Sequence, residues 1–176
     1  MTPIKYKCAQ ITYLRLLNTP DTLKERIKVQ AANFGLDPAI VYGICKQESG
    51  LNSAAVRFEP HYKWLFKPES VRPKICSVDT ETVLQKTSFG LMQVMGAVFR
   101  EYGYSDWLSV LPSSPETQLH YGCKHLSNLK RRFPKDNDYI SAYNQGSPRK
   151  KTDRTYENQH YVDNVLKYSK KWDDIV

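Results

Sequence analysis

Residues 38–50, PAIVYGICKQESG, carry the strongest local signal in the chain. Asp37 and Pro38 are residue types that begin helices, and Gly50 is the type that ends them. The segment between them is apolar, which predicts a short helix buried in the core. Its last turn holds Glu48, although the partial negative charge at a helix C-terminus favours Lys, Arg or His there. A residue that breaks a local rule in an otherwise consistent sequence indicates a functional position.

A glutamate serves well as a general acid at neutral pH when its pKa is raised from the ordinary value of about 4.3. The helix dipole contributes about 0.3–1 kcal/mol, which is less than one pKa unit, so burial has to supply the rest. Val41, Ile44 and Cys45 offer apolar neighbours for Glu48. Taken alone, the segment favours an exposed glutamate without function.

The rest of the chain is dominated by helical patterns, in which apolar residues recur at three- and four-residue spacing. We predict helices over residues 20–35, 38–49, 89–103, 113–133, 136–146 and 157–172. Alternating strand patterns are few, and residues 57–87 form a long irregular stretch with scattered Pro and charge, of a kind that is often functional. The sequence therefore predicts a mainly α protein with one domain.

Composition limits the class of protein. The chain has 176 residues, 40% of them hydrophobic, and a mean hydropathy of −0.59, so we expect a soluble domain without a transmembrane segment. Residues 1–20 lack the apolar block of a secretory signal. The chain has 26 Lys and Arg and 18 Asp and Glu, so its net charge is +8. Such a charge attracts polyanions such as nucleic acid, anionic lipid or cell-wall polymer.

The cysteines give no sign of a metal site or of a disulfide framework, because they are widely spaced: Cys8, Cys45, Cys76 and Cys123. We expect them to be reduced and mostly buried. Zinc binding by Cys123 with His120 and His125 is disfavoured, since two histidines five residues apart do not share a helical face. We expect neither a metal nor a cofactor.

Three segments follow Glu48 and Ser49 in order: residues 88–95 (SFGLMQVM), 141–146 (SAYNQG) and 157–162 (ENQHYV). Together they resemble the soluble lytic transglycosylases and goose-type lysozymes, whose motifs run E-S, G-L-M-Q, A-Y-N and a C-terminal tyrosine. Each motif alone is weak, but their order over roughly residues 20–170 is specific. The resemblance implies a lysozyme-like fold: one compact domain over residues 1–176 with a core of about 20–172.

The resemblance also implies a role for each matching residue. Glu48 would be the catalytic acid, and Tyr161, in the E-x-x-x-Y-V pattern, would hydrogen-bond its carboxyl group. A buried acid needs a neutral partner to hold its rotamer, and a phenol is suitable, so Tyr143 is a second candidate. The residues expected to bind substrate, with Gly90 allowing close approach to the sugar, are Ser49, Ser88, Gly90, Leu91, Met92, Gln93, Ala142, Asn144 and Glu157.

The number of carboxylates decides the type of reaction. Most glycosidases place two across the scissile bond. Goose-type lysozymes have an aspartate two residues after the glutamine of G-L-M-Q, where this chain has Met95. A lytic transglycosylase needs one, because the C6 hydroxyl of the substrate attacks and its N-acetyl group stabilises the cation. The resemblance thus implies cleavage of the MurNAc-β-1,4-GlcNAc bond of peptidoglycan to a 1,6-anhydro product, with Glu48 as acid and then as base.

The separation of the first two motifs leaves an alternative open. Glu48 and Gly90 lie 42 positions apart, more than twice the separation usual in lytic transglycosylases, so residues 57–87 are expected to hold an insertion. A second carboxylate from it, Glu59, Asp79 or Glu81, would make the protein a hydrolysing muramidase. The simpler expectation is that Glu59 pairs with Arg57 or His61 and that Glu81 caps a helix.

A non-catalytic function is the other alternative. The basic run at residues 147–154 (SPRKKTDR), near Tyr156 and Tyr161, fits a surface for wall polymer or nucleic acid. No nucleic-acid motif accompanies it, so we expect wall polymer and no nucleic acid as partner. The resemblance further implies a monomeric phage or prophage protein, an endolysin or virion component, made in the host cytoplasm and acting on the cell wall.

Overall fold

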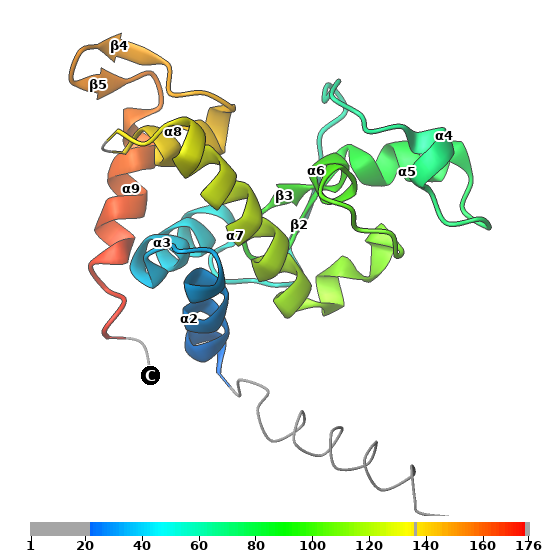
Figure 1. Ribbon diagram of the computed structural model, residues 1–176, viewed down its shortest axis with the longest axis horizontal. Coiled ribbons are helices and arrows are strands. Elements are labelled where there is room, and N and C mark those ends of the chain that lie inside the picture. Colours follow the sequence, from blue (N-terminus) through cyan, green and yellow to red (C-terminus); the bar gives the residue numbers. More distant parts are fainter. Residues whose placement is uncertain (1–21, 136, 175–176) are drawn as a thin grey trace, which may run out of the picture.

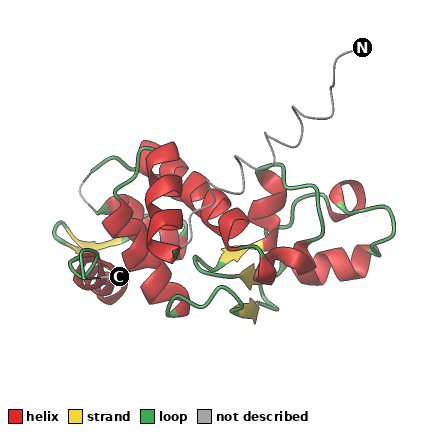
Figure 2. Ribbon diagram, turned by 90° about the horizontal axis from the view of Figure 1, so that it is seen from below, coloured by secondary structure: helices red, strands yellow, loops and turns green. Residues whose placement is uncertain are grey.

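The computed structural model describes residues 22–135 and 137–174. Helices account for most of these residues and the strands are short (Figures 1 and 2), so the predicted mainly α class is confirmed. The elements in chain order are α2 Leu23–Asn33, α3 Pro38–Ser49, β1 Val56–Phe58, α4 Pro68–Val71, α5 Val78–Gln85, β2 Thr87–Phe89, β3 Val94–Met95, α6 Gly96–Glu101, the 3-10 helix η1 Leu108–Ser113, α7 Pro115–Arg132, α8 Asp138–Gln145, β4 Lys150–Thr152, β5 Thr155–Tyr156 and α9 Gln159–Ser169.

Five helices, α2, α3, α7, α8 and α9, form the larger part of the fold, and α7 runs through the middle of it (Figure 1). The predicted starts hold for two of them. Asp37 caps α3 by accepting a hydrogen bond from the N–H of Ala39 at 2.9 Å, and α7 begins at Pro115. Apolar side chains of these helices meet in one core that is closed to solvent, with Ile27, Val41, Leu126 and Val162 among its members. The helix pattern of the sequence therefore places the core correctly.

Strands β1, β2 and β3 form an antiparallel sheet beside this helical group (Figure 1). The prediction of one helix over residues 89–103 is wrong: residues 90–93 form a turn between β2 and β3, and only residues 96–101 are helical. Gly90 and Gln93 have φ of +70° and +47°, which a right-handed helix does not allow. The apolar spacing that suggested a helix comes instead from a strand and a turn that are both buried.

Residues 59–86, which we call the excursion, leave the sheet after β1 and return to it at β2. Their ends meet because β1 pairs with β2, and the N–H of Glu59 donates to the carbonyl of Lys86 at 2.8 Å. The excursion lies within the predicted insertion, but it is not irregular throughout, since it contains α4 and α5. It carries the two most exposed apolar side chains among those described, Trp64 (75%) and Ile75 (86%).

Three cysteines, Cys45, Cys76 and Cys123, are free and buried, as predicted, and Cys8 lies outside the described residues. So do residues 1–20, on which the expectation about a secretory signal rests. Within the described part of the chain, no helix combines the length and apolarity needed to span a membrane. The same residues contain no group of three or more His, Cys, Asp or Glu side chains arranged to hold a metal ion.

Candidate active site

Glu48 is positioned by the close packing of α3 against α9. A Cβ atom at Gly43 would lie 2.4 Å from the backbone oxygen of Val165, so only glycine lets the two helices approach this closely. From that contact, Glu48 lies five residues toward the C-terminus of α3 and Tyr161 four residues toward the N-terminus of α9. Because the two helices run antiparallel, these steps go in the same direction and bring Glu48 and Tyr161 face to face.

The expected hydrogen bond to Glu48 is present. The hydroxyl of Tyr161 donates to Oε1 of Glu48 at 2.6 Å. This is a short hydrogen bond, and it fixes one carboxyl oxygen. Tyr161 is itself buried, so its hydroxyl has little access to water as an alternative partner. The arrangement holds the carboxyl rotamer without placing a counter-charge in contact with it.

The surroundings of Glu48 favour its neutral form. Burial raises its pKa from the ordinary value, and this effect outweighs the hydrogen bond from Tyr161 and the charge of Arg57, which both lower it. The same environment acts on its neighbours, since burial and the charge of Glu48 raise the pKa of both Tyr161 and Tyr143. A glutamic acid with a raised pKa, held by a neutral phenol, has the properties of a general acid.

The second motif forms the turn at residues 90–93, which lies against the end of α3. The Ser49 hydroxyl donates to the carbonyl oxygens of Leu91 at 2.9 Å and of Cys45 at 3.1 Å. The Tyr143 hydroxyl donates to the carbonyl oxygen of Met92 at 2.8 Å. Of the two tyrosines proposed as partners of the acid, Tyr161 therefore bonds Glu48 directly, whereas Tyr143 bonds the turn.

Gln118 holds the turn from α7. Its side chain is fully buried, accepts from the N–H of Leu91 at 2.9 Å and donates to the carbonyl oxygens of Ser53 at 2.8 Å and Leu111 at 2.6 Å. A Cβ at position 90 would lie 2.0 Å from this amide. Within the protein, Gly90 thus serves close packing against Gln118, whereas the resemblance implied close approach to a sugar.

Several residues expected to bind substrate have their side chains in the interior. Ser88, Leu91, Met92 and Ala142 are buried. The amide of Gln93 is also occupied: its nitrogen donates to the carbonyls of Ala55 and Gly90, and its oxygen accepts from Ser88. In the structure these side chains support the turn and the core around it, and their contact with substrate stays a prediction.

The ends of α8 and α9 form the opposite side of the site. Asn158 donates to Asn144 Oδ1 at 3.0 Å and to the carbonyl of Ser141 at 3.0 Å, and it accepts from the Ser141 hydroxyl at 2.7 Å. Asn144 is exposed. Glu157 is exposed, and its backbone N–H donates to the carbonyl of Arg149 at 2.9 Å. Among the expected substrate contacts, Asn144 and Glu157 have accessible side chains.

Glu81 is not a second carboxylate of the site. It lies on α5 of the excursion with no exposed surface, and both of its oxygens accept from the equally buried guanidinium of Arg100, at 2.7 and 2.9 Å. Burial acts to raise its pKa, but the bonds from Arg100 and Gln85 and the charge of Arg100 lower it below the ordinary value. Nor does it cap a helix, because Ser77 caps α5. Glu81 and Arg100 form a structural ion pair that joins the excursion to α6.

Glu59 pairs with Arg57, as the simpler expectation had it, with Nε 2.5 Å from Oε1. Arg57 lies on β1, and Glu59 follows directly after this strand. The charge of Arg57 lowers the pKa of Glu48, so Arg57 lies within electrostatic reach of the acid. Both side chains of the pair are partly exposed.

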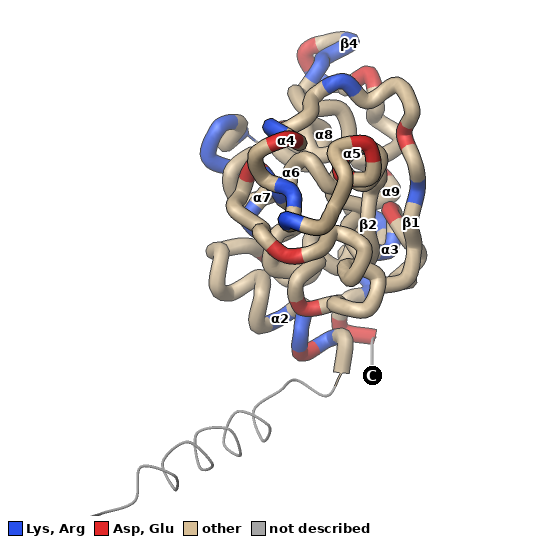
Figure 3. Tube along the Cα trace, turned by 90° about the vertical axis from the view of Figure 1, so that its right-hand side faces the viewer, with Lys and Arg blue, Asp and Glu red and all other residues tan. Residues whose placement is uncertain are grey.

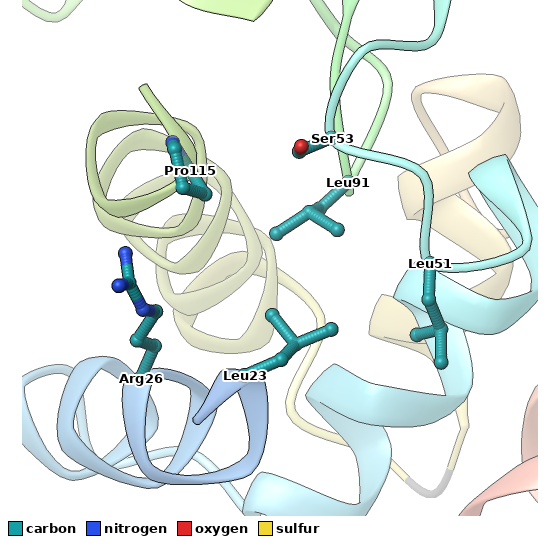
Figure 4. Close-up of a pocket in the computed structure, with 6 residues that line it drawn as sticks. All are labelled: Leu23, Arg26, Leu51, Ser53, Leu91 and Pro115. Carbon is teal, nitrogen blue, oxygen red and sulfur yellow. The ribbon is translucent and has the colours of Figure 1, made fainter. Parts of the chain in front are cut away.

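A cavity of about 180 Å³ lies near the turn but is not this site (Figure 4). It is bounded by α2, the start of α7 and the loop after α3, and Arg26 at its edge is paired with Glu116. Neither Glu48 nor Tyr161 lines it. The residues that do are Leu23, Arg26, Leu51, Ser53, Leu91 and Pro115.

Sequence reasoning missed Gln118, Asn158 and Arg100, which position other groups. Asn158 had a signal, because it lies within the last motif, beside Glu157. Gln118 and Arg100 had none. Both are polar residues in helical segments whose partners lie far away in the sequence.

Comparisons with known proteins give a family and a fold. The family model described as "Transglycosylase SLT domain" matches residues 25–165. No curated protein matches the chain. Among solved structures, the chain is similar to the X-ray structure of an inactive mutant of the lytic transglycosylase Slt from Pseudomonas aeruginosa, with 22% sequence identity and a TM-score of 0.58. The match covers 88% of this chain but 24% of that one, so the chain spans about a quarter of its length. At this identity the likeness shows the fold alone.

Proposed function

Because the chain belongs to the SLT transglycosylase domain family, we propose that it is a lytic transglycosylase that cleaves the MurNAc-β-1,4-GlcNAc bond of peptidoglycan. The observation that carries the proposal is the pairing of Tyr161 with Glu48 at 2.6 Å on a carboxyl group whose pKa burial has raised. Such a group can give up a proton at neutral pH and take one back later in the same turnover.

In the proposed reaction Glu48 acts twice. The neutral carboxyl first donates its proton to the bridging oxygen, so the glycosidic bond breaks and the GlcNAc side leaves as an alcohol. The N-acetyl group of the substrate stabilises the positive charge at C1 of MurNAc. The C6 hydroxyl of the same sugar then attacks C1 and gives its proton to the Glu48 carboxylate. This step closes the 1,6-anhydro ring and restores the acid without using water.

The bonds around the turn support this assignment. Ser49 and Tyr143 join the end of α3 and α8 to the carbonyls of the same turn, and Gln118 holds the turn from behind. Three helices thus fix the backbone beside Glu48. Such fixed geometry is what a site needs in order to position a substrate close to its acid.

The mass of the digestion products tests the proposal. Purified peptidoglycan is incubated with the wild type, with Glu48→Gln and with a matched control, Glu69→Gln, which removes an exposed charge on α4. We expect muropeptides with anhydro ends from the wild type and the control and none from Glu48→Gln. Clearing of cell walls by Glu48→Gln at the wild-type rate would overturn the catalytic role.

The alternative is hydrolysis with a second carboxylate, and Glu59 is a better candidate for that carboxylate than Glu81. Glu59 pairs with Arg57, whose charge reaches Glu48, and it is partly exposed, so it has room to activate a water. In that case the products would carry one more water than the anhydro forms, and Glu59→Gln would abolish them. Anhydro products that persist in Glu59→Gln would exclude this route.

We also propose that the protein acts on the cell wall as a phage endolysin or virion component, which rests on the sequence resemblance alone. Expression in a bacterial host together with a membrane pore former tests it. We expect lysis with the wild type and intact cells with Glu48→Gln.

A further inference from the structure

A second feature near the site is a group of eight exposed basic residues, which we call the basic rim. It consists of four residues at and after the end of α7 and four on the β4–β5 hairpin: Lys130, Arg131, Arg132, Lys135, Arg149, Lys150, Lys151 and Arg154. Residues 130–156 contain these eight cations and three Asp residues, so they hold five of the eight net positive charges of the chain. Figure 3 shows Lys and Arg gathered at β4.

Contacts at the start of α8 show that the two halves of the rim form one surface. Lys150 on the hairpin lies 3.4 Å from the carboxylate of Asp138, the first residue of α8. Lys130 on α7 lies 5.8 Å from the ring of Tyr139, the next residue. Within the described part of the chain, Lys150 is the only one of the eight with a carboxylate partner. The rim therefore presents cations that the fold itself does not neutralise.

The chemistry of the rim favours a hydrophilic anion. Three rings lie within it, but Lys130 covers Tyr139, Arg132 covers Phe133, and Lys150 covers Tyr156, which is buried. None of the exposed large apolar side chains found in the described residues lies between residues 130 and 156. Base stacking by nucleic-acid-binding proteins needs accessible rings, and insertion into a membrane surface needs accessible apolar groups. The rim offers charge without either.

The hairpin of the rim joins directly to the candidate active site. At its base, the carbonyl of Arg149 accepts from the N–H of Glu157, and the next residue, Asn158, bonds Asn144. Tyr161, four residues after Glu157, bonds the acid. The rim thus borders the site on its α8–α9 side. An anion carried by the same polymer as the scissile bond would meet these cations.

We propose that the basic rim binds the carboxylates of the peptide stems of peptidoglycan, so that the substrate is glycan that carries peptides and not naked glycan. The proposal rests on the proposed function, because it takes peptidoglycan as the substrate. A strand with a stem on each MurNAc presents carboxylates at regular intervals, which accounts for cations spread along the surface in place of one compact pocket. Electrostatic attraction of this kind lowers KM and weakens as salt rises.

Binding to insoluble peptidoglycan tests the inference without cleavage. The Glu48→Gln protein is sedimented with intact peptidoglycan and with glycan from which an amidase has removed the stems. The rim variant adds Arg149→Gln, Lys150→Gln, Lys151→Gln and Arg154→Gln. A matched control adds Lys28→Gln, Lys74→Gln, Lys167→Gln and Lys170→Gln, which remove the same charge from exposed positions elsewhere. Exchanging Arg and Lys at the four rim positions tests whether charge alone suffices.

For intact peptidoglycan at low salt, we expect about fivefold weaker binding by the rim variant, because exposed ion pairs each contribute a factor of a few at most. The control and the Arg–Lys exchange should bind as the parent does, and all proteins should bind the stripped glycan alike. Equal loss on stripped glycan, or no loss on intact peptidoglycan, overturns the inference. Duplex DNA serves as a third ligand. If the rim variant bound DNA more weakly but bound peptidoglycan as the parent does, nucleic acid would be the partner and the inference would also be overturned. Failure of the proposed function would appear separately, as wild-type digests without cleaved glycan.

Discussion

Replacing Tyr161 with Phe removes one hydroxyl and leaves the packing of α9 nearly unchanged. The lost interaction is the 2.6 Å hydrogen bond to Oε1 of Glu48, which the structure shows between two residues 113 positions apart. Hydrogen bonds to charged groups contribute about 1.5–3 kcal/mol. If the bond orients the carboxyl group throughout the reaction, its loss slows the chemical step by a factor of about 10 to 150.

The same substitution shifts the pH profile, and the sign follows from the causes of the pKa shift. Burial raises the pKa of Glu48, and the bond from Tyr161 opposes that rise. Without the bond, the pKa rises further. Activity needs the protonated acid and is lost as pH rises through this pKa, so the alkaline limb of the profile moves to higher pH in Tyr161→Phe.

Initial rates of peptidoglycan clearance over a range of pH measure both effects. Tyr143→Phe is the matched control, because it removes a buried hydroxyl that bonds the carbonyl of Met92 and not the acid. We expect it to lower stability and to leave the alkaline limb where it is. A Tyr161→Phe enzyme with the wild-type rate, or with its alkaline limb at lower pH, would refute this reasoning.

Three further perturbations test the framework of the site. Glu48→Gln should be more stable than the wild type at pH 7, because the pKa of Glu48 is raised in the folded state and its ionised form therefore opposes folding. In urea denaturation, the difference in free energy of unfolding between the two proteins should shrink as pH falls toward 4. Gly43→Ala should destabilise by about 1–3 kcal/mol and reduce activity, since the new methyl group meets the backbone of Val165 and must separate α3 from α9; a stable, fully active variant would contradict the packing argument. Glu81→Gln should destabilise by about 3–5 kcal/mol by leaving Arg100 buried without its counter-charge, whereas Glu81→Leu with Arg100→Met should recover most of that loss in thermal melts. If Glu81→Gln and the double variant lost the same stability, the ion pair itself, and not the unpaired charge of Arg100, would account for the loss.

The helical part of the fold follows from local sequence, because its signals are local. Asp37, Pro38 and Gly50 bound α3 as predicted, with Gly50 in the left-handed conformation at φ +64°. Ser114 illustrates the limit of such signals: α7 begins next to it, but its side chain makes no capping hydrogen bond. The periodicity of residues 157–172 likewise predicts α9, whose observed ends are Gln159 and Ser169.

The turn after β2 could not be predicted in this way, because distant residues determine it. Residues 89–103 have the spacing of a helix, but the amide of Gln118 takes the N–H of Leu91, and Gly90 adopts a positive φ. The resemblance, and not the spacing, implied that Gly90, Leu91 and Met92 bind substrate, and the structure places all three in the interior. Tertiary contacts overrode local propensity here.

The candidate site was easier to predict in its residues than in its bonds. The resemblance gave Tyr161 as the partner of Glu48, whereas chemistry alone left Tyr143 as a second candidate. The structure bonds Tyr161 to the acid, because α9 packs on Gly43 of α3. The sequence likewise did not distinguish Glu59 from Glu81 as a possible second carboxylate. Burial separates them: Glu81 is fully buried with Arg100, whereas Glu59 is partly exposed beside Arg57.

The most direct test of the account is the titration of Glu48 itself, followed by NMR of its carboxyl carbon in protein labelled at glutamate, with Glu48→Gln assigning the signal. The account predicts a pKa above the ordinary value, because burial outweighs the bond from Tyr161 and the charge of Arg57. A carboxyl group that titrates at or below about 4.3, as a solvated glutamate does, would contradict it.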